Sequence, residues 1–160
     1  MALLVVLICT ICFYALANIT TKNTSYDPAS SINRKKCANK LERKVYDNLR
    51  ILGVYPCVQE RVGKYTLDFS LYHPNGKKLC IEVDGYIFHN TSESKKKDAI
   101  RDSFLRKKGW EIMRLGEREL QKDFYRTMRK VETKLYDMDL LPPEHPSVQL
   151  KIKEELNTNH

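Results

Sequence analysis

The sequence predicts an α/β fold in which helices flank a mixed four-stranded sheet, with the elements in the order αβββαβα. Apolar residues recur at helical spacing in residues 38–52 and 117–136. Between these segments lie three short runs typical of strands, residues 57–62, 65–72 and 78–83. A chain of 160 residues is long enough for one domain with a hydrophobic core and an appendage.

A β-α-β crossover is expected to complete the sheet. The second helix should begin after Asn90, where Glu93 follows three residues later as in a capping box, and end at Gly109. Residues 110–115 predict the fourth strand. Because a helix connects the two strands, this strand should run parallel to residues 78–83.

An uncharged apolar segment, residues 2–19, precedes the predicted domain. Its length is near the minimum of about 17–20 residues that a membrane-spanning helix needs. Ala15-Leu16-Ala17 resembles a signal-peptidase site, which would make the protein secreted. However, basic residues follow the apolar segment, from Lys22 to Arg34-Lys35-Lys36, and none precedes it. We therefore expect a single hydrophobic helix that anchors the protein in a membrane and keeps the domain in the cytoplasm, with secretion after signal cleavage as the alternative.

Composition predicts the remaining boundaries. Residues 20–37 are polar and predict a flexible linker, and residues 38–137 form the predicted domain. Leu141-Pro142-Pro143 interrupts the C-terminal tail, residues 138–160. Within that tail, residues 148–156 predict a short amphipathic helix whose role the sequence leaves open.

Three acidic residues, Asp68, Glu82 and Asp84, lie inside apolar strand segments. Burying a carboxylate is costly unless it is paired or binds a cation. Either an ion pair with a basic neighbour or a divalent cation could explain these residues. Their number favours the cation.

The turn between the second and third strands decides whether these acids meet. If its loop is Pro74-Asn75-Gly76, Asp68 lies directly opposite Glu82, with Cβ atoms roughly 4.5–5.5 Å apart. A two-residue loop would place the two side chains on opposite faces of the sheet. We predict the three-residue loop, and two opposed carboxylates are best suited to Mg²⁺ or Mn²⁺.

The charge distribution indicates an anionic partner. The formal net charge is +8, with basic clusters at residues 34–36, 40–50, 95–97 and 106–108. A basic surface around an acidic site suits a nucleic acid, because cations hold the phosphates while carboxylates hold a metal. Anionic lipid, or an ordinary solvated surface, is the alternative. No Cys-x-x-Cys pair among the five cysteines is accompanied by a second pair or a His cluster, so a zinc site is not expected and a reducing compartment is the simpler reading.

Taken together, these segments resemble the PD-(D/E)XK, or restriction-endonuclease-like, superfamily, and within it the small domains similar to very-short-patch-repair endonucleases. The resemblance covers residues 39–120 approximately. It is carried by Glu42, Leu67-Asp68-Phe69, Ile81-Glu82-Val83-Asp84-Gly85, Phe88-His89, and the series Asp98, Arg101, Leu105, Gly109-Trp110 and Arg114.

The resemblance implies a role for each of these acids. Asp68 would be the principal metal ligand, Glu82 would fill the second acidic position, and the Val83 carbonyl could be a further ligand. His89 would assist catalysis, and Glu42 would reach the metal through water. The position that usually holds lysine is Asp84, which would be a second metal ligand, would orient His89, or would mark a weakly active site.

The resulting expectation is a membrane-anchored, Mg²⁺-dependent endonuclease-like domain that hydrolyses DNA. His89 would move a proton, and Arg101 or Lys95, Lys96 and Lys97 would contact phosphate. A non-catalytic nucleic-acid-binding relative and a membrane-proximal interaction module with structural acids are the alternatives. Asp98 and Arg101 could also form a simple i,i+3 pair on a helix. No organic cofactor is expected, and the sequence leaves the oligomeric state open.

Overall fold

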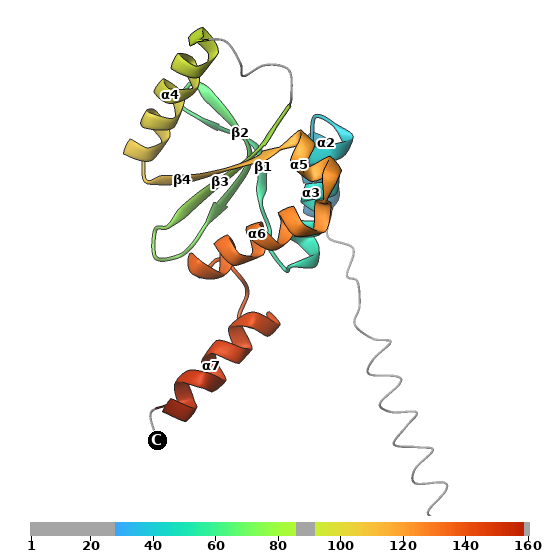
Figure 1. Ribbon diagram of the computed structural model, residues 1–160, viewed down its shortest axis with the longest axis vertical. Helices are drawn as coiled ribbons and strands as arrows, with labels where there is room; N and C mark the ends of the chain where they lie inside the picture. Colours follow the sequence, from blue (N-terminus) through green and yellow to red (C-terminus); the bar gives the residue numbers. More distant parts are fainter. Residues whose placement is uncertain (1–27, 86–91, 159–160) are drawn as a thin grey trace, which may run out of the picture.

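The computed structural model describes residues 28–85 and 92–158. Its centre is a four-stranded sheet in the order β1-β2-β3-β4 (Figure 1). The strands are β1 (Cys57–Val62), β2 (Tyr65–Tyr72), β3 (Lys78–Asp84) and β4 (Trp110–Gly116). The first three are antiparallel neighbours, and β4 pairs parallel to β3. The predicted mixed sheet and its parallel fourth strand are therefore confirmed.

Helices cover both faces of this sheet (Figure 1). On one face lies α4 (Ser92–Lys107), the crossover between β3 and β4. On the other lie α3 (Lys40–Ile51), α5 (Glu117–Lys122) and α6 (Phe124–Asp137), which pack on the larger core cluster. The flanking helices are α2 (Pro28–Lys36) and α7 (Pro146–Thr158).

Two elements differ from the sequence predictions. Residues 117–136 form two helices, because the Asp123 side chain accepts a hydrogen bond from the Arg126 backbone N–H at 2.9 Å and starts α6. The predicted linker, residues 20–37, contains α2. This helix is held against α3 by the bidentate pair of Arg34 with Asp47, at 2.7 and 2.9 Å.

The β2–β3 turn has the predicted three-residue loop, Pro74-Asn75-Gly76. Tyr72 pairs with Lys78, and the His73 N–H donates to the Lys77 carbonyl at 2.9 Å. Gly76 supplies the positive φ of 90° that the turn requires. The register of the hairpin is thus the one that the opposed carboxylates need.

The side-chain alternation of β2 differs from the prediction. Regular alternation along residues 65–72 would place Leu67, Phe69 and Leu71 on one face. However, Leu67 packs with Cys80 and Leu105 beneath α4. Phe69 and Leu71 pack in the cluster on the opposite face. The change of face occurs at Asp68, where the facing residue of β1 leaves the regular strand conformation.

The predicted membrane helix, residues 2–19, lies outside the described residues. Within residues 28–85 and 92–158, every helix is too short or too polar to span a bilayer.

Candidate active site

Two carboxylates from neighbouring strands meet at one end of the sheet. Phe69 and Ile81 form the last pair of this hairpin, and Asp68 of β2 and Glu82 of β3 are the next residues beyond it. Burial raises the pKa of Glu82, and the negative charge of Asp68 raises it further. The two acids therefore lie close enough for their charges to interact, while direct cross-strand opposition stays a prediction.

Hydrogen bonds hold both oxygens of Asp68. Gln59 donates its side-chain amide to Oδ1 at 3.0 Å, and the Val83 backbone N–H donates to Oδ2 at 2.9 Å. The Val83 bond also shows that β3 donates to a side chain at this point and not to the β2 backbone. Asp68 is thereby fixed between β1 and β3.

Gln59 is a functional candidate that sequence reasoning missed. It stands opposite Asp68 in β1 and has φ of 54°, a left-handed conformation that costs a residue with a side chain roughly 1–2 kcal/mol. Its amide also lies 3.5 Å from Glu42 Oε2. Strained residues of this kind cluster at functional sites, but nothing in the sequence marks Gln59 as one of them.

Glu82 is buried and forms an ion pair. Its Oε1 lies 2.6 Å from Arg101 Nη2, and the two side chains are 6% and 18% exposed. Cys80 donates its thiol to the same oxygen at 2.9 Å. Burial raises the pKa of Glu82, whereas Arg101 and Cys80 lower it, and the net direction is upward.

Arg101 was predicted to contact nucleic-acid phosphate, but it points inward from α4. Besides Glu82, its guanidinium binds the Thr66 carbonyl at 3.0 Å. Arg101 therefore connects α4 to both β2 and β3, and it supplies positive charge beside the carboxylates.

Asp84 lies next to an arginine at the end of β3. Arg114 Nη1 lies 3.1 Å from Asp84, and Arg114 Nη2 lies 2.7 Å from Asp102 of α4. Burial lowers the pKa of Arg114, but Asp102 and Asp84 more than offset this effect. These contacts join β3, β4 and α4. They also give Asp84 a structural partner that sequence reasoning did not identify.

Glu42 caps its own helix. The Asn39 side chain accepts the Glu42 N–H at 2.9 Å and donates to Glu42 Oε1 at 2.9 Å, while the Ala38 N–H donates to Oε2 at 2.7 Å. This reciprocal cap resembles a capping box. Burial raises the pKa of Glu42, and the nearby charges of Asp68 and Glu82 add to the rise. Glu42 thus lies near both acids, but its hydrogen bonds serve the start of α3.

Asp68 and Glu82 are the predicted metal ligands, and a divalent cation needs enough oxygen donors around it. In the two described ranges, no group of three or more His, Cys, Asp and Glu side chains is placed to hold a metal ion. Mg²⁺, however, is usually bound through one or two carboxylates together with water and substrate oxygens. Asp68 and Glu82 fit that hard, oxygen-seeking ion. His89 lies outside the described residues.

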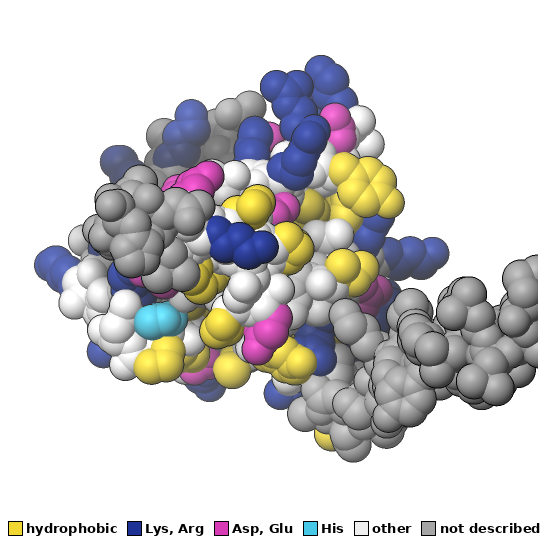
Figure 2. Space-filling view, turned by 90° about the horizontal axis from the view of Figure 1, so that it is seen from below, with side chains coloured by type: hydrophobic (Ala, Val, Ile, Leu, Met, Phe, Trp, Pro, Cys, Tyr) yellow, Lys and Arg dark blue, Asp and Glu magenta, His cyan; other side chains and the backbone are white. Residues whose placement is uncertain are grey.

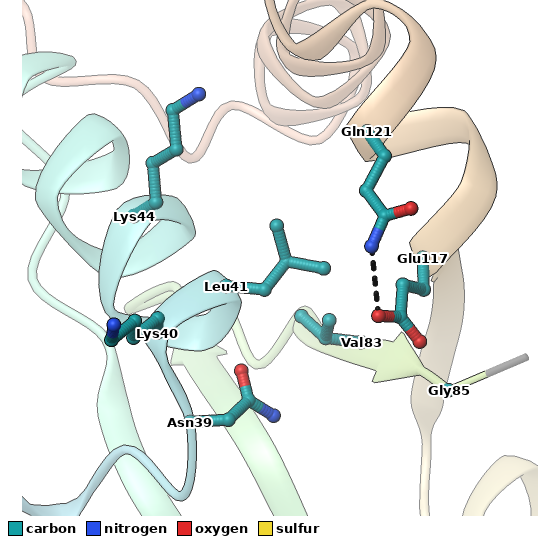
Figure 3. A pocket seen from close by; sticks show the side chains of 8 residues that line it. All are labelled: Asn39, Lys40, Leu41, Lys44, Val83, Gly85, Glu117 and Gln121. Carbon is teal, nitrogen blue, oxygen red and sulfur yellow. Dashed lines mark hydrogen bonds between the residues drawn. The ribbon is translucent and has the colours of Figure 1, made fainter.

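A pocket of about 470 Å³ adjoins this site on the side of α3 (Figure 3). It lies between α3, α5 and the end of β3. Its lining residues are Asn39, Lys40, Leu41, Lys44, Val83, Gly85, Glu117 and Gln121.

Basic side chains are frequent on the surface of the described residues. Figure 2 shows one face of the molecule, with many Lys and Arg side chains around its edge and some acidic side chains among them. On α4, Lys95, Lys96 and Lys97 are exposed, as the phosphate-binding prediction requires. Lys97 also pairs with Glu93 at 2.8 Å, an exposed contact of little energetic weight.

The comparisons with known proteins agree with this architecture. The model of a restriction-endonuclease-like family, REase_MTES_1575, matches residues 41–137, from α3 to the end of α6. No curated protein and no solved structure matches the chain. The family match confirms the restriction-endonuclease-like resemblance, but it does not extend to the narrower similarity with very-short-patch-repair endonucleases.

Proposed function

Since the chain belongs to the restriction-endonuclease-like family REase_MTES_1575, we propose that its domain hydrolyses DNA phosphodiester bonds with the help of Mg²⁺ or Mn²⁺. The observation that carries this proposal is the closeness of Asp68 and Glu82, which follow the last residue pair of the β2–β3 hairpin. The negative charge of Asp68 raises the pKa of Glu82, and the same negative field favours a divalent cation.

The donor atoms of the site have distinct roles in this proposal. Asp68 and Glu82 would hold the ion, with the Val83 carbonyl as a further ligand. When bound, such an ion polarises a phosphate and lowers the pKa of a coordinated water. Gln59 and the Val83 N–H orient Asp68. Glu42 fixes the start of α3 beside these residues.

Arg101 would supply the positive charge that lysine usually provides at the position of Asp84. A guanidinium 2.6 Å from Glu82 can stabilise charge that develops on a phosphate held at the carboxylates. Asp84 positions the end of β3 through Arg114. His89 remains our proposal for the group that transfers a proton, because an imidazole ordinarily changes protonation near neutral pH.

A second candidate function is nucleic-acid binding without cleavage. The ion pair of Glu82 with Arg101 favours it, because a carboxylate already neutralised by arginine has less affinity for a metal ion. Both candidates share the basic surface, so turnover is the property that separates them.

The deciding experiment is cleavage of supercoiled plasmid in Mg²⁺ by the full chain and by Asp68→Asn. Asparagine keeps the size of the side chain but removes its charge. We expect cleavage to fall by more than about 100-fold, beyond the effect of losing a group that only orients a metal ligand, while DNA binding persists. The matched control is Asp139→Asn, an exposed aspartate that pairs with Lys77 and should leave cleavage unchanged. DNA binding by the unaltered chain without any cleavage would instead establish the second candidate.

The placement of the domain is a further part of the proposal. The uncharged residues 2–19 and the basic residues after them support a membrane-anchored domain on the cytoplasmic side, with secretion as the alternative. Extraction of the full chain from membranes tests this. An anchored protein stays with the membrane in alkaline carbonate, whereas a secreted one reaches the medium with a shortened N-terminus.

A further inference from the structure

The pocket beside the carboxylates has walls of three chemical kinds (Figure 3). Lys40 and Lys44 of α3 line the pocket on its basic side, and their exposed side chains extend from the helix away from Glu117. Glu117 and Gln121 of α5 form the facing wall, where the Gln121 amide donates to Glu117 Oε1 at 2.9 Å. Between them lie the apolar side chains of Leu41 and Val83, with the Asn39 side chain at the edge.

A ligand that matches these walls has three corresponding parts. It carries negative charge for the lysines, an apolar planar body for the floor, and a hydrogen-bond donor for the Glu117 carboxylate. A carboxylate can accept about four hydrogen bonds, so Glu117 can accept one from a ligand in addition to the bond from Gln121 and its other contact. A nucleotide whose base bears an exocyclic amine has all three parts, because Glu and Asp accept from such amines.

We propose that this pocket binds one unpaired nucleotide of the DNA strand next to the cleaved phosphate. The base rests on Leu41 and Val83 with its amine toward Glu117, and Lys40 and Lys44 contact its phosphate. The inference rests on the proposed function and deepens it. Val83 connects the two sites, because it lines the pocket while its N–H holds Asp68 at 2.9 Å.

The position of Lys44 supports this orientation. Its ammonium lies 4.0 Å from the centre of the Phe124 ring, a cation–π contact that fixes the direction of this side chain. Lys40 lies one helical turn earlier on the same face of α3. The two cations therefore lie on the same side of the bound nucleotide.

Gly85 keeps the pocket open and allows a sharp test. A Cβ built on Gly85 would lie 3.9 Å from Glu117 Oε2, an ordinary contact, and the backbone there does not have the positive φ that would exclude other residues. The further atoms of a larger side chain would then extend toward Glu117. Gly85→Leu should fill the pocket while leaving Asp68 and Glu82 in place.

The experiment measures binding of single-stranded six-nucleotide probes to the full chain by fluorescence anisotropy, in EDTA so that no metal contributes. We expect oligo(dC) to bind more tightly than oligo(dT), which lacks an exocyclic amine. Gly85→Leu and the double variant Lys40→Gln/Lys44→Gln should each weaken oligo(dC) binding by about tenfold, the usual effect of removing one base interaction or a pair of phosphate interactions. Lys153→Gln, an exposed lysine on α7, is the charge control and should have no effect.

Competition separates a nucleotide pocket from a simple anion site. Deoxycytidine monophosphate should displace the probe at a lower concentration than inorganic phosphate or deoxycytidine does. Equal displacement by inorganic phosphate, or normal binding by Gly85→Leu, would overturn the inference. Lys40 and Lys44 are exposed on α3, so their replacement should not disturb the fold. If Gly85→Leu lowers the melting temperature, the lysine double variant therefore still tests the pocket.

The two proposals fail in distinguishable ways. If Gly85→Leu binds the probe normally while Asp68→Asn abolishes cleavage, the nucleotide pocket is wrong and the nuclease remains. If Gly85→Leu loses the probe but the unaltered chain never cleaves, the pocket is right and the protein is a nucleic-acid-binding relative.

Discussion

At the level of single residues, the pair of Glu82 and Arg101 combines a stability role with a functional one. Its members come from β3 and α4, and both are mostly shielded from water. A buried ion pair adds little net stability compared with apolar residues, yet removal of one member leaves an uncompensated charge. The two roles can therefore be separated by removing one member and then both.

Arg101→Met should lower the free energy of unfolding at pH 7.5 by about 3–5 kcal/mol, the usual effect of breaking a buried pair. Burial already raises the pKa of Glu82 in the folded state. Without Arg101 the pKa rises further, so stability falls as the pH increases from the ordinary glutamate range through the raised value. At pH 5 the carboxyl is more protonated and the loss should be smaller. Urea unfolding at both pH values measures the difference.

Two control variants test the cause of this loss. Arg101→Met combined with Glu82→Gln should recover part of the stability at pH 7.5, because the buried charge is gone. Arg106→Met removes an exposed arginine of the same helix, 3.6 Å from Asp102, and should cost less than about 1 kcal/mol. An equal loss at both pH values for Arg101→Met would contradict an origin in the charge of Glu82.

Gln59 gives a second prediction at this scale. Both Gln59→Gly and Gln59→Ala remove the hydrogen bond to Asp68, and both should reduce cleavage by about 10–100-fold. In an ordinary strand a glycine variant is less stable than an alanine variant, and at position 59 this order should be reversed. Because φ is 54°, glycine should be more stable than alanine by roughly 1 kcal/mol in chemical unfolding. A more stable alanine variant would show that the left-handed conformation is absent.

These residues also show what sequence reasoning can and cannot reach at this scale. The closeness of Asp68 and Glu82 follows from the register that an odd-length turn sets, which is a property of one hairpin. The inward direction of Arg101 depends on how α4 packs on the sheet, and the strain at Gln59 depends on β1 facing Asp68. Interactions between elements distant in the chain leave no local pattern.

At the level of elements, the β1–β2 hairpin is docked on α4. Gly63, at the hairpin turn, has φ of 65°, and a Cβ there would lie 2.7 Å from Cζ of Phe104. Tyr65 packs edge-on against the same ring, with centroids 5.3 Å apart. The hairpin that carries Asp68 thus contacts the helix that carries Arg101.

Gly63→Ala should therefore destabilise the domain by about 1–3 kcal/mol, because it combines an unfavourable φ with overpacking against Phe104. Gly76→Ala is the matched control. That glycine also has positive φ, at 90°, but a Cβ there would have nothing within 4 Å. Thermal unfolding should show the larger loss for Gly63→Ala, and equal losses would mean that the Phe104 contact contributes nothing.

The element boundaries were predictable where the signal was local. The four strands and the helices α3 and α4 agree with periodicity and with turn residues. The break at Asp123 was missed, because an aspartate on the polar side of a helix looks the same in sequence whether it is solvated or begins a new helix. α2 was missed because its polar composition resembles a linker, while its ordering comes from contacts with α3.

At the level of the whole molecule, a chain with a formal net charge of +8 carries an acidic site. This arrangement separates two tasks that one local charge cannot perform, since lysines and arginines attract the phosphate backbone while carboxylates attract a cation. Association with DNA should then depend strongly on salt, through release of counterions from the phosphates.

The exposed lysines of α4 test this separation. Replacing Lys95, Lys96 and Lys97 by Gln should weaken binding to duplex DNA and reduce the slope of log K against log salt by up to about 2.7, or about 0.9 for each phosphate that a lysine no longer neutralises. The slope is measured by fluorescence anisotropy between low and moderate salt, with Lys153→Gln as the control on α7. Weaker binding at every salt concentration with an unchanged slope would mean that these lysines act through the fold of α4. Cleavage per bound DNA should stay the same, because the carboxylates are untouched and only the attraction of the substrate is reduced.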